Sequence, residues 1–237
     1  MSTYLLYLFS AFVYASLALC VLLSYKIAKV VNLSLGSAFT LGGYLSTFNP
    51  LISPTVGALI GFLLHICTKR MDTGRATLFS LGLAIAIEEV LRISFRVEYI
   101  LLRSEVIYLF GAKLVLEHFF AFLISAAFIT SFLVLDIRSP SSKLKLKIVE
   151  EDPEIAEIYG IDAEKVRAVI LMISSALFCC LGSLYLAGRI ISPTIGWFSL
   201  VFSFIIATIA NVFREKAYMS ILPVSLGLCW LMWQFLY

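Results

Sequence analysis

The chain has 237 residues, of which 61% are hydrophobic and only 14% are charged, and its mean hydropathy is +1.01. These values exclude an ordinary soluble domain, and because the apolar residues come in long runs without alternation they favour membrane helices over barrel strands. The net charge of +3 is small and the basic residues lie between the apolar runs. Nucleic acid is therefore not an expected partner, whereas the basic residues should report orientation in a membrane.

The pattern predicts an all-α, polytopic membrane protein, with one transmembrane domain over residues 1–237 and about eight spans. The first apolar run follows neither a basic region nor a small-residue cleavage site, so we expect it to be retained as a helix. The spans are predicted at about 4–24, 30–47, 55–67, 76–95, 118–136, 163–186, 195–212 and 217–237.

The second predicted span is unusually rich in small and polar residues, which include Asn32, Ser34, Gly36, Ser37 and Gly42. Such residues allow helices to approach closely and can break a helix locally. Two interpretations stay open: a tightly packed helix, or a polar wall of a solute pathway. Asn32 is the best candidate for a polar contact, because an amide in lipid is costly without a partner.

The fourth predicted span carries three ionisable residues near its exit, namely Glu88, Glu89 and Arg92. Their spacing allows either glutamate to meet the arginine on one helix. They form either an ion pair at the membrane interface or a gate or solute-facing charge. Residues 96–116 then read as a mixed loop that lies partly on the membrane surface.

A polar island at about 148–162 contains a short helix with a signal at each end. Asp152 is a good N-cap, Pro153 suits the first helical position, and Glu154 favours the positive end of the helix dipole. Gly160 is typical of the left-handed residue just past a helix, and Asp162 can cap the helix that follows. We therefore predict a helix of about seven residues before Gly160.

This short helix should expose an apolar patch. Ile155, Ile158 and Tyr159 fall on one face at i, i+3 and i+4, within a segment that also contains Ala156 and Ile161. A solvated helix without a partner is the alternative. An exposed patch of this kind usually meets another molecule, so we favour a docking role.

Orientation follows from the basic residues. With the N-terminus outside and the spans alternating, 13 lysines and arginines lie in cytoplasmic loops and span ends and 5 lie outside, which together make the 18 of the chain. This bias predicts that both termini are extracytoplasmic and that residues 152–161 face the cytoplasm.

Several kinds of chemistry are not expected. The sequence has no G-x-x-x-x-G-K-[ST] motif for binding phosphate, so ATP hydrolysis by this chain is not predicted. The cysteines lie inside apolar runs and His65 and His118 are far apart in sequence, so neither a metal site nor an activated nucleophile is expected. We predict a chain that is not an enzyme and has no cofactor of its own.

Three segments in order carry a family resemblance. They are Val-Asn-Leu-Ser-Leu-Gly at 31–36 followed by Gly42-Gly43-Tyr44; Asp152, Ala156, Gly160, Ile161 and Val166 followed by Leu-Gly-Ser-Leu at 181–184; and Ile-Ser-Pro-Thr-Ile-Gly at 191–196. Together they cover most of the chain. The sequence resembles permease subunits of ABC importers, specifically the branched-chain amino acid (high-affinity leucine/isoleucine/valine) permease family. It departs at 207–212, where the family has a glycine-rich segment, and it is shorter than typical members.

The resemblance implies a membrane-spanning subunit of an ATP-driven importer for branched-chain or related amino acids. ATP would be bound by partner subunits and coupled through Asp152, Pro153, Glu154, Ile155, Ala156, Ile158, Tyr159, Gly160 and Ile161. The solute pathway is predicted at Asn32, Ser34, Gly36, Ser37, Gly42, Ser192 and Pro193.

The partners implied are two ATPase subunits, a second permease of the same or a homologous kind, an extracytoplasmic solute-binding protein and membrane lipid. The expected location is the cell membrane. Two alternatives remain: an ion-coupled secondary transporter, and a membrane scaffold subunit that does not transport.

Overall fold

A computed structural model describes residues 2–95, 99–102, 104–109, 112–138, 140–213 and 217–236. Residues 96–98 and 103 of the predicted surface loop, the charged residues 214–216 and Tyr237 lie outside this described part. The helices are α1 (Ser2–Lys26), α2 (Ser34–Leu45), α3 (Ser53–Thr68), α4 (Thr73–Phe95), α5 (Leu116–Arg138), α6 (Pro140–Glu151), α7 (Pro153–Ile158), α8 (Ala163–Tyr185), α9 (Ile195–Val212) and α10 (Ala217–Leu236), with a 3-10 turn at Pro50–Ile52.

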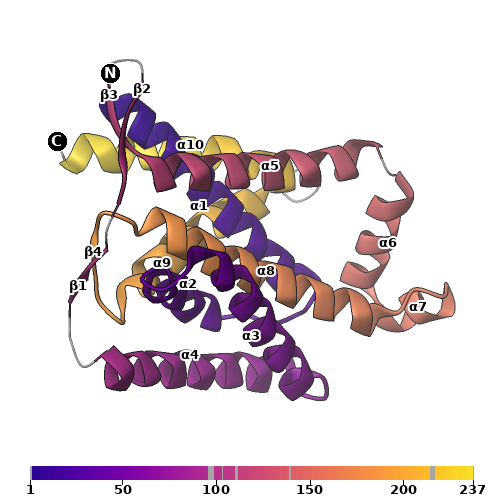
Figure 1. Cartoon of the computed structure of the whole chain (residues 1–237). Helices are drawn as coiled ribbons and strands as arrows, with labels where there is room; N and C mark the ends of the chain where they lie inside the picture. Colours follow the sequence, from indigo (N-terminus) through magenta and orange to yellow (C-terminus); the bar gives the residue numbers. More distant parts are fainter. Residues whose placement is uncertain are drawn as a thin grey trace.

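These helices form a bundle whose two ends differ. In Figure 1, α4, α5, α8 and α10 run across the view, and both ends of the chain lie at its left side. At the opposite end, α6 descends from α5 and α7 turns the chain back into α8. The all-α, polytopic architecture predicted from composition is confirmed.

Among the described residues, five helical stretches are long and apolar enough to cross a membrane: Leu5–Lys26, Pro50–Thr68, Leu116–Leu135, Ala163–Tyr185 and Ile195–Val212. They correspond to the predicted spans 1, 3, 5, 6 and 7. The other three predicted spans do not meet the same standard. The helix α4 carries Arg75, Glu88, Glu89 and Arg92, and within the described residues Ala217–Met232 of α10 counts as a shorter apolar helix.

The second predicted span is shorter than expected. The helix α2 begins at Ser34, not near residue 30, and has 12 residues. Its length is about 18 Å at 1.5 Å per residue, against a hydrocarbon core of about 30 Å. The residues between α1 and α2 are not helical, and Lys29 has a φ of +55°. Irregular backbone at membrane depth is tolerated only inside protein, and this segment is mostly buried.

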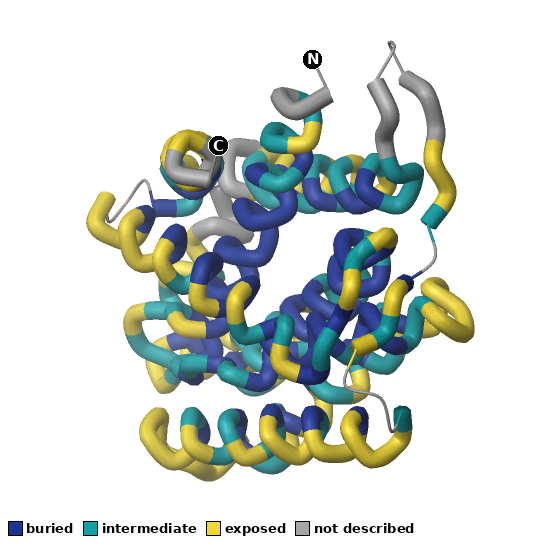
Figure 2. The backbone as a smooth tube through the Cα atoms, turned by 90° about the vertical axis from the view of Figure 1, so that its left-hand side faces the viewer, coloured by how far each residue is buried: buried dark blue, intermediate teal, exposed yellow. Residues whose placement is uncertain are grey.

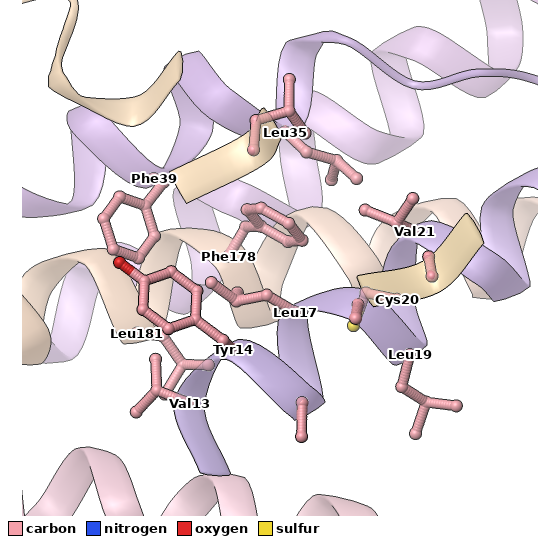
Figure 3. Close-up of a cluster of buried hydrophobic side chains, with 14 of the residues drawn as sticks. Val13, Tyr14, Leu17, Leu19, Cys20, Val21, Leu35, Phe39, Phe178 and Leu181 are labelled. Carbon is pink, nitrogen blue, oxygen red and sulfur yellow. The ribbon is translucent and has the colours of Figure 1, made fainter. Parts of the chain in front are cut away.

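The core lies where α1, α2 and α8 meet. Figure 3 shows side chains from these three helices pointing toward one another: Val13, Tyr14 and Leu17 from α1, Leu35 and Phe39 from α2, and Phe178 and Leu181 from α8. Figure 2 shows that the outer layer formed by α4 is exposed over most of its surface. The buried residues of α4 form one narrow stripe: Ala76, Ser80, Ala84, Glu88 and Leu91.

Glycines let α2 approach its neighbours at backbone distance. A Cβ on Gly42 would lie 1.9 Å from the carbonyl oxygen of Cys179 in α8, and one on Gly182 of α8 would lie 1.9 Å from that of Phe39. Against α9, a Cβ on Gly196 would lie 1.9 Å from the carbonyl oxygen of Gly36. Since real contacts of this kind are at least 3 Å, α2 is held between α8 and α9 by positions that accept no side chain.

Two short strand pairs were not predicted from the sequence. The strands β1 (Ile100–Leu101) and β4 (Ile190–Ile191) pair antiparallel, with Ile100 opposite Ile191. The strands β2 (Val106–Leu109) and β3 (Ala112–Val115) form an antiparallel hairpin, with Val106 opposite Val115. The region predicted as a mixed loop is therefore partly ordered as strands. The β1–β4 pair ties this region to the link between α8 and α9.

Candidate functional site

The N-terminus of α7 is capped by a side chain. Asp152 has extended backbone, and its carboxylate accepts hydrogen bonds from the backbone N–H of Glu154 at 2.9 Å and of Ile155 at 3.3 Å. Pro153 occupies the first helical position, where its missing N–H leaves no bond unmade. The start of the helix is therefore as predicted, and the helix has six residues where about seven were expected.

The C-terminus of α7 is closed by a Schellman motif. The N–H of Ile161 donates to the carbonyl of Ala156, and the N–H of Gly160 donates to that of Glu157, both at 2.9 Å. Gly160 has a φ of +74°, which is the left-handed conformation that this motif requires. A six-residue helix has little stability of its own, so these two closures hold α7 as one defined unit.

One face of α7 carries the predicted apolar patch, formed by Ile155, Ile158 and Tyr159. These residues are 45%, 83% and 71% exposed, whereas Ala156, on the adjoining side of the helix, is completely buried. Glu154 and Glu157 on the same short helix are also exposed. The helix therefore presents apolar side chains beside carboxylates.

The inner face of α7 fixes it between α6 and α8. Val149 of α6, Ala156 of α7 and Ala163 of α8 are all buried in the apolar core, and α7 contacts both α6 and α8. Asp162 then caps α8 by accepting from the N–H of Lys165 at 3.0 Å, and its carboxylate pairs with the Lys165 ammonium at 2.9 Å. These two contacts hold the pKa of Asp162 below its usual value, the side-chain contact more than the backbone one.

The first turn of α8 is also tied to α3. Glu164 lies 3.9 Å from His65 of α3, 3.7 Å from the ammonium of Lys69, which follows the last residue of α3, and 3.5 Å from Arg167 on its own helix. Lys29 joins these four residues around a small cavity of about 60 Å³. This end of the bundle therefore carries a cluster of basic side chains close to α7.

The helix α6 (Pro140–Glu151) was missed by the sequence reasoning, which recognised only a basic run before the capped helix. Its sequence offered one usable signal, the Lys147–Glu151 spacing of i, i+4, and these side chains lie 3.8 Å apart in the structure. The unit that projects from the bundle is consequently larger than predicted: it comprises α6 as well as α7 (Figure 1).

The predicted pathway residues on and before α2 are buried. Asn32 accepts from the N–H and the hydroxyl of Ser34, at 3.1 and 2.7 Å, whereas its own Nδ2 is buried without a hydrogen-bond partner. Ser37 donates to the carbonyl of Ser34 at 2.9 Å. For Gly36 and Gly42 the structure favours the packing interpretation, because both lie against neighbouring backbone.

Ser192 and Pro193 are close to the same helix. They lie between β4 and α9, and the residues on either side of them contact α2: Ile191 of β4 lies near Gly43, and Gly196 of α9 packs on Gly36. The N–H of Gly196 also donates to the hydroxyl of Thr40 at 3.0 Å. The segment that contains Ser192 and Pro193 is therefore attached to α2, whereas a solute pathway shared with the residues of α2 remains a prediction.

The charged cluster of α4 separates into two parts. Arg92 pairs with Glu89 at 3.3 Å, and both side chains are about half exposed. Glu88 points the other way, is only 8% exposed, and faces the Trp197 side chain of α9. Of the two pairings that the spacing allowed, the one with Glu89 is therefore formed.

Several residues that matter to this arrangement were not predicted as site residues: Lys29, Thr40, Ser80, Glu150, Gly182 and Gly196. Ser80 of α4 accepts from the N–H of Leu33 and donates to the carbonyl of Val31, both at 3.1 Å. Most of these contacts join positions far apart in the sequence, so local patterns gave no signal for them.

The chain matches one known protein family over most of its length. A family described as "Branched-chain amino acid transport system / permease component" matches residues 3–224. No curated protein and no solved structure shows a match to the chain.

Proposed function

Since the chain belongs to the family of permease components of branched-chain amino acid transport systems, we propose that it is the membrane-spanning subunit of an ATP-driven importer. It is a multi-pass membrane protein. In the proposed complex it pairs with a second permease subunit and with two ATPase subunits, which bind the ATP. An extracytoplasmic binding protein delivers a branched-chain or related amino acid.

The observation that carries this proposal is the exposed apolar patch on α7, a short helix that is capped at both ends. Ile155, Ile158 and Tyr159 are large apolar side chains at one end of the bundle, away from both termini (Figure 1). Isolated apolar residues on a surface are ordinary, but three on one rigid turn form a surface that suits a groove on a partner. The exposed carboxylates beside the patch add a charge pattern that can orient such a partner.

The local structure suits transmission of force. When two ATPase subunits close on ATP, α7 is displaced with the surface on which it docks. The Asp152 cap and the Gly160 closure keep α7 rigid, and Asp162 starts α8 immediately afterwards. Displacement of α7 therefore reaches α8, which packs on α2 and α3 through glycine contacts. In this proposal the movement of these helices exchanges outward-facing and inward-facing arrangements.

Solute selection is the finer part of the proposal. Asn32, Ser34 and Ser37 supply polar groups at a buried helix start, and the Asn32 amide has an unused donor. Among the five membrane-length helices, charged residues lie near the ends. That pattern suits a zwitterionic or neutral solute better than an ion.

The test combines copurification and transport. The tagged chain is solubilised from its native membrane, and the proteins bound to it are identified. We expect an ATPase subunit that is retained by Ile158→Leu and lost with Ile158→Asp, because a charge in the docking surface would have to be desolvated. Lys145→Asp, which places the same acid on the exposed surface of α6, is the matched control and should retain the ATPase.

Vesicles containing the wild-type complex should then take up a branched-chain amino acid when ATP is present. Uptake driven by an ion gradient without an ATPase would instead identify a secondary transporter. A folded chain that binds other membrane proteins but moves no solute would identify a scaffold subunit. Either result overturns the importer proposal.

A further inference from the structure

The α6–α7 unit is attached to the bundle by contacts with the end of α1 and the segment that follows it, in addition to its covalent links to α5 and α8. Lys26, at the end of α1, pairs with the Glu150 carboxylate of α6 at 3.1 Å. Lys29, in the segment that follows α1, donates from its ammonium to the Glu150 backbone carbonyl at 2.6 Å. We name these two contacts the latch.

The latch satisfies groups that α6 cannot satisfy itself. Glu150 is next to the last residue of α6, and the last four carbonyls of a helix have no partner within it. Lys29 therefore caps the C-terminus of α6 from another part of the chain, where a cation is also favoured by the helix dipole. The Lys26 side chain is 13% exposed and that of Glu150 is 29% exposed, so their ion pair is sheltered from water.

The latch ends on the irregular segment between α1 and α2. Lys29 has a φ of +55°, the only positive value of a residue other than glycine in the described part of the chain. A residue with a Cβ is disfavoured in this conformation and persists there only when its surroundings hold it. The Lys29 contact to α6 is one such restraint; others are the contacts of Ser80 with Val31 and Leu33, and the bond from the N–H of Val30 to the carbonyl of Ser24 at 3.4 Å.

This segment leads directly into the central helix. Asn32 and Ser34 are bonded to each other where α2 begins, and Thr40 of α2 accepts from the N–H of Gly196 in α9. A continuous set of contacts therefore leads from Glu150 through Lys26 and Lys29 to α2, and from α2 to α9. The residues joined at the latch are 121 positions apart in sequence, so the contact is a product of the fold.

We propose that Glu150 is a positioning residue that transmits movement of the α6–α7 unit to α2 through Lys26 and Lys29. This inference rests on the proposed importer function for its role in transport, but the latch itself is a property of the chain alone. Glu150 touches neither the exposed patch of α7 nor the solute in this scheme. Its effect is on the irregular segment at residues 27–33.

The first test uses the full chain in lipid nanodiscs, without an ATPase. Amide hydrogen exchange is measured for peptides that cover residues 27–33. Glu150→Ala removes the Lys26 ion pair but keeps the backbone carbonyl that Lys29 binds, and Lys29→Met removes the bond to that carbonyl. Each variant should speed this exchange by roughly two- to fivefold, the range for loss of a partly sheltered pair. Glu151→Ala is the matched control, because it is the next residue, and its ion pair to Lys147 lies within α6 and is exposed.

A double-mutant cycle separates the latch from unrelated damage. If Lys26 and Glu150 act through each other, Lys26→Met combined with Glu150→Ala should speed exchange no more than the larger single change. Effects that add, an equal rise in Glu151→Ala, or unchanged exchange in Glu150→Ala would each overturn the latch.

The second test asks whether the latch transmits movement of the α6–α7 unit to α2. In the reconstituted complex, Glu150→Ala should retain the bound ATPase but reduce the solute moved per ATP by about two- to fivefold. Ile158→Asp, in contrast, should lose the ATPase. Faster exchange at 27–33 with unchanged uptake per ATP would overturn the transmission role. If no ATPase binds the wild type, the proposed function fails while the exchange result still decides the latch.

Discussion

Adding one methyl group at Gly182 should separate α2 from α8. The new Cβ would lie 1.9 Å from the carbonyl oxygen of Phe39, whereas ordinary contact begins at 3.4 Å, so the helices must move apart locally by more than 1 Å. The atoms that it meets belong to the backbone and cannot rotate away. We expect Gly182→Ala to destabilise the protein by about 1–3 kcal/mol, the usual penalty for overpacking.

The assay is thermal unfolding of the full chain in one detergent, followed by loss of the monodisperse peak. For a chain of this size the expected loss corresponds to a melting temperature lower by roughly 2–12 °C. Gly82→Ala is the matched control, because a Cβ on Gly82 of α4 has no atom within 4 Å. That change should be neutral or stabilise by up to about 1 kcal/mol through helix propensity. Equal melting temperatures for the two variants would refute the close-contact reasoning.

Three other predictions follow from the local geometry. Gly160→Val should reduce ATP-coupled uptake, because a φ of +74° disfavours a branched side chain by about 1–2 kcal/mol, whereas Gly160→Asn should be mild; equal uptake by both variants would contradict this. Asn32→Ala should lower stability by about 1–2 kcal/mol through loss of two buried bonds to Ser34, whereas Asn49→Ala, which loses one exposed bond to the N–H of Leu51, should lower it less in the same melt. Because the pKa of Asp162 is lowered in the folded state, its carboxylate stabilises the protein at neutral pH, and this stabilisation is lost as pH falls through the folded-state pKa. The difference in melting temperature between wild type and Asp162→Ala should therefore shrink below about pH 4. A difference that grows as pH falls would contradict this reasoning.

The bounded helix could be predicted from sequence because its determinants act within one turn. Asp152 accepts hydrogen bonds from N–H groups two and three residues further on, Pro153 lacks an N–H that would have no partner, and Gly160 allows the turn that closes the helix. All of these effects can be predicted from neighbouring residues. The same holds for Ile155, Ile158 and Tyr159, whose shared face follows from helical spacing alone. Their exposure agrees with that pattern, whereas their docking role remains a proposal.

The break before α2 could not be predicted in the same way. Lys29 adopts a positive φ just after α1, where the N–H of Val30 donates to the carbonyl of Ser24 at 3.4 Å, and its other restraints come from Glu150 and Ser80, which lie in other helices. The hairpin β2–β3 was overlooked for a different reason. Its strands are only four residues each and lie in a region that hydropathy places at the membrane surface.

One packing signal was present in the sequence but was not used. Gly57 and Gly61 are four residues apart on α3, the small-x-x-x-small spacing that allows membrane helices to approach closely. In the structure a Cβ on either would lie within 2.5 Å of a backbone carbonyl oxygen of α8. The α3–α8 contact therefore follows the same rule as the contacts of α2, and only the choice of partner helix needed the fold.

Two connections of the α6–α7 unit lead to a last prediction. One is covalent and runs from Gly160 into α8, and the other is the latch from Glu150 into the segment before α2; the covalent link to α5 is unchanged by the variants below. If they are independent routes, the free-energy effects of Gly160→Val and Lys29→Met on uptake per ATP should add within about 0.5 kcal/mol, as distant changes without shared partners usually do. If α7 instead acts only through α8, the double variant should show the effect of Gly160→Val alone. That result would mean that the latch only holds α6 in place, because removing a contact that transmits movement must reduce uptake per ATP.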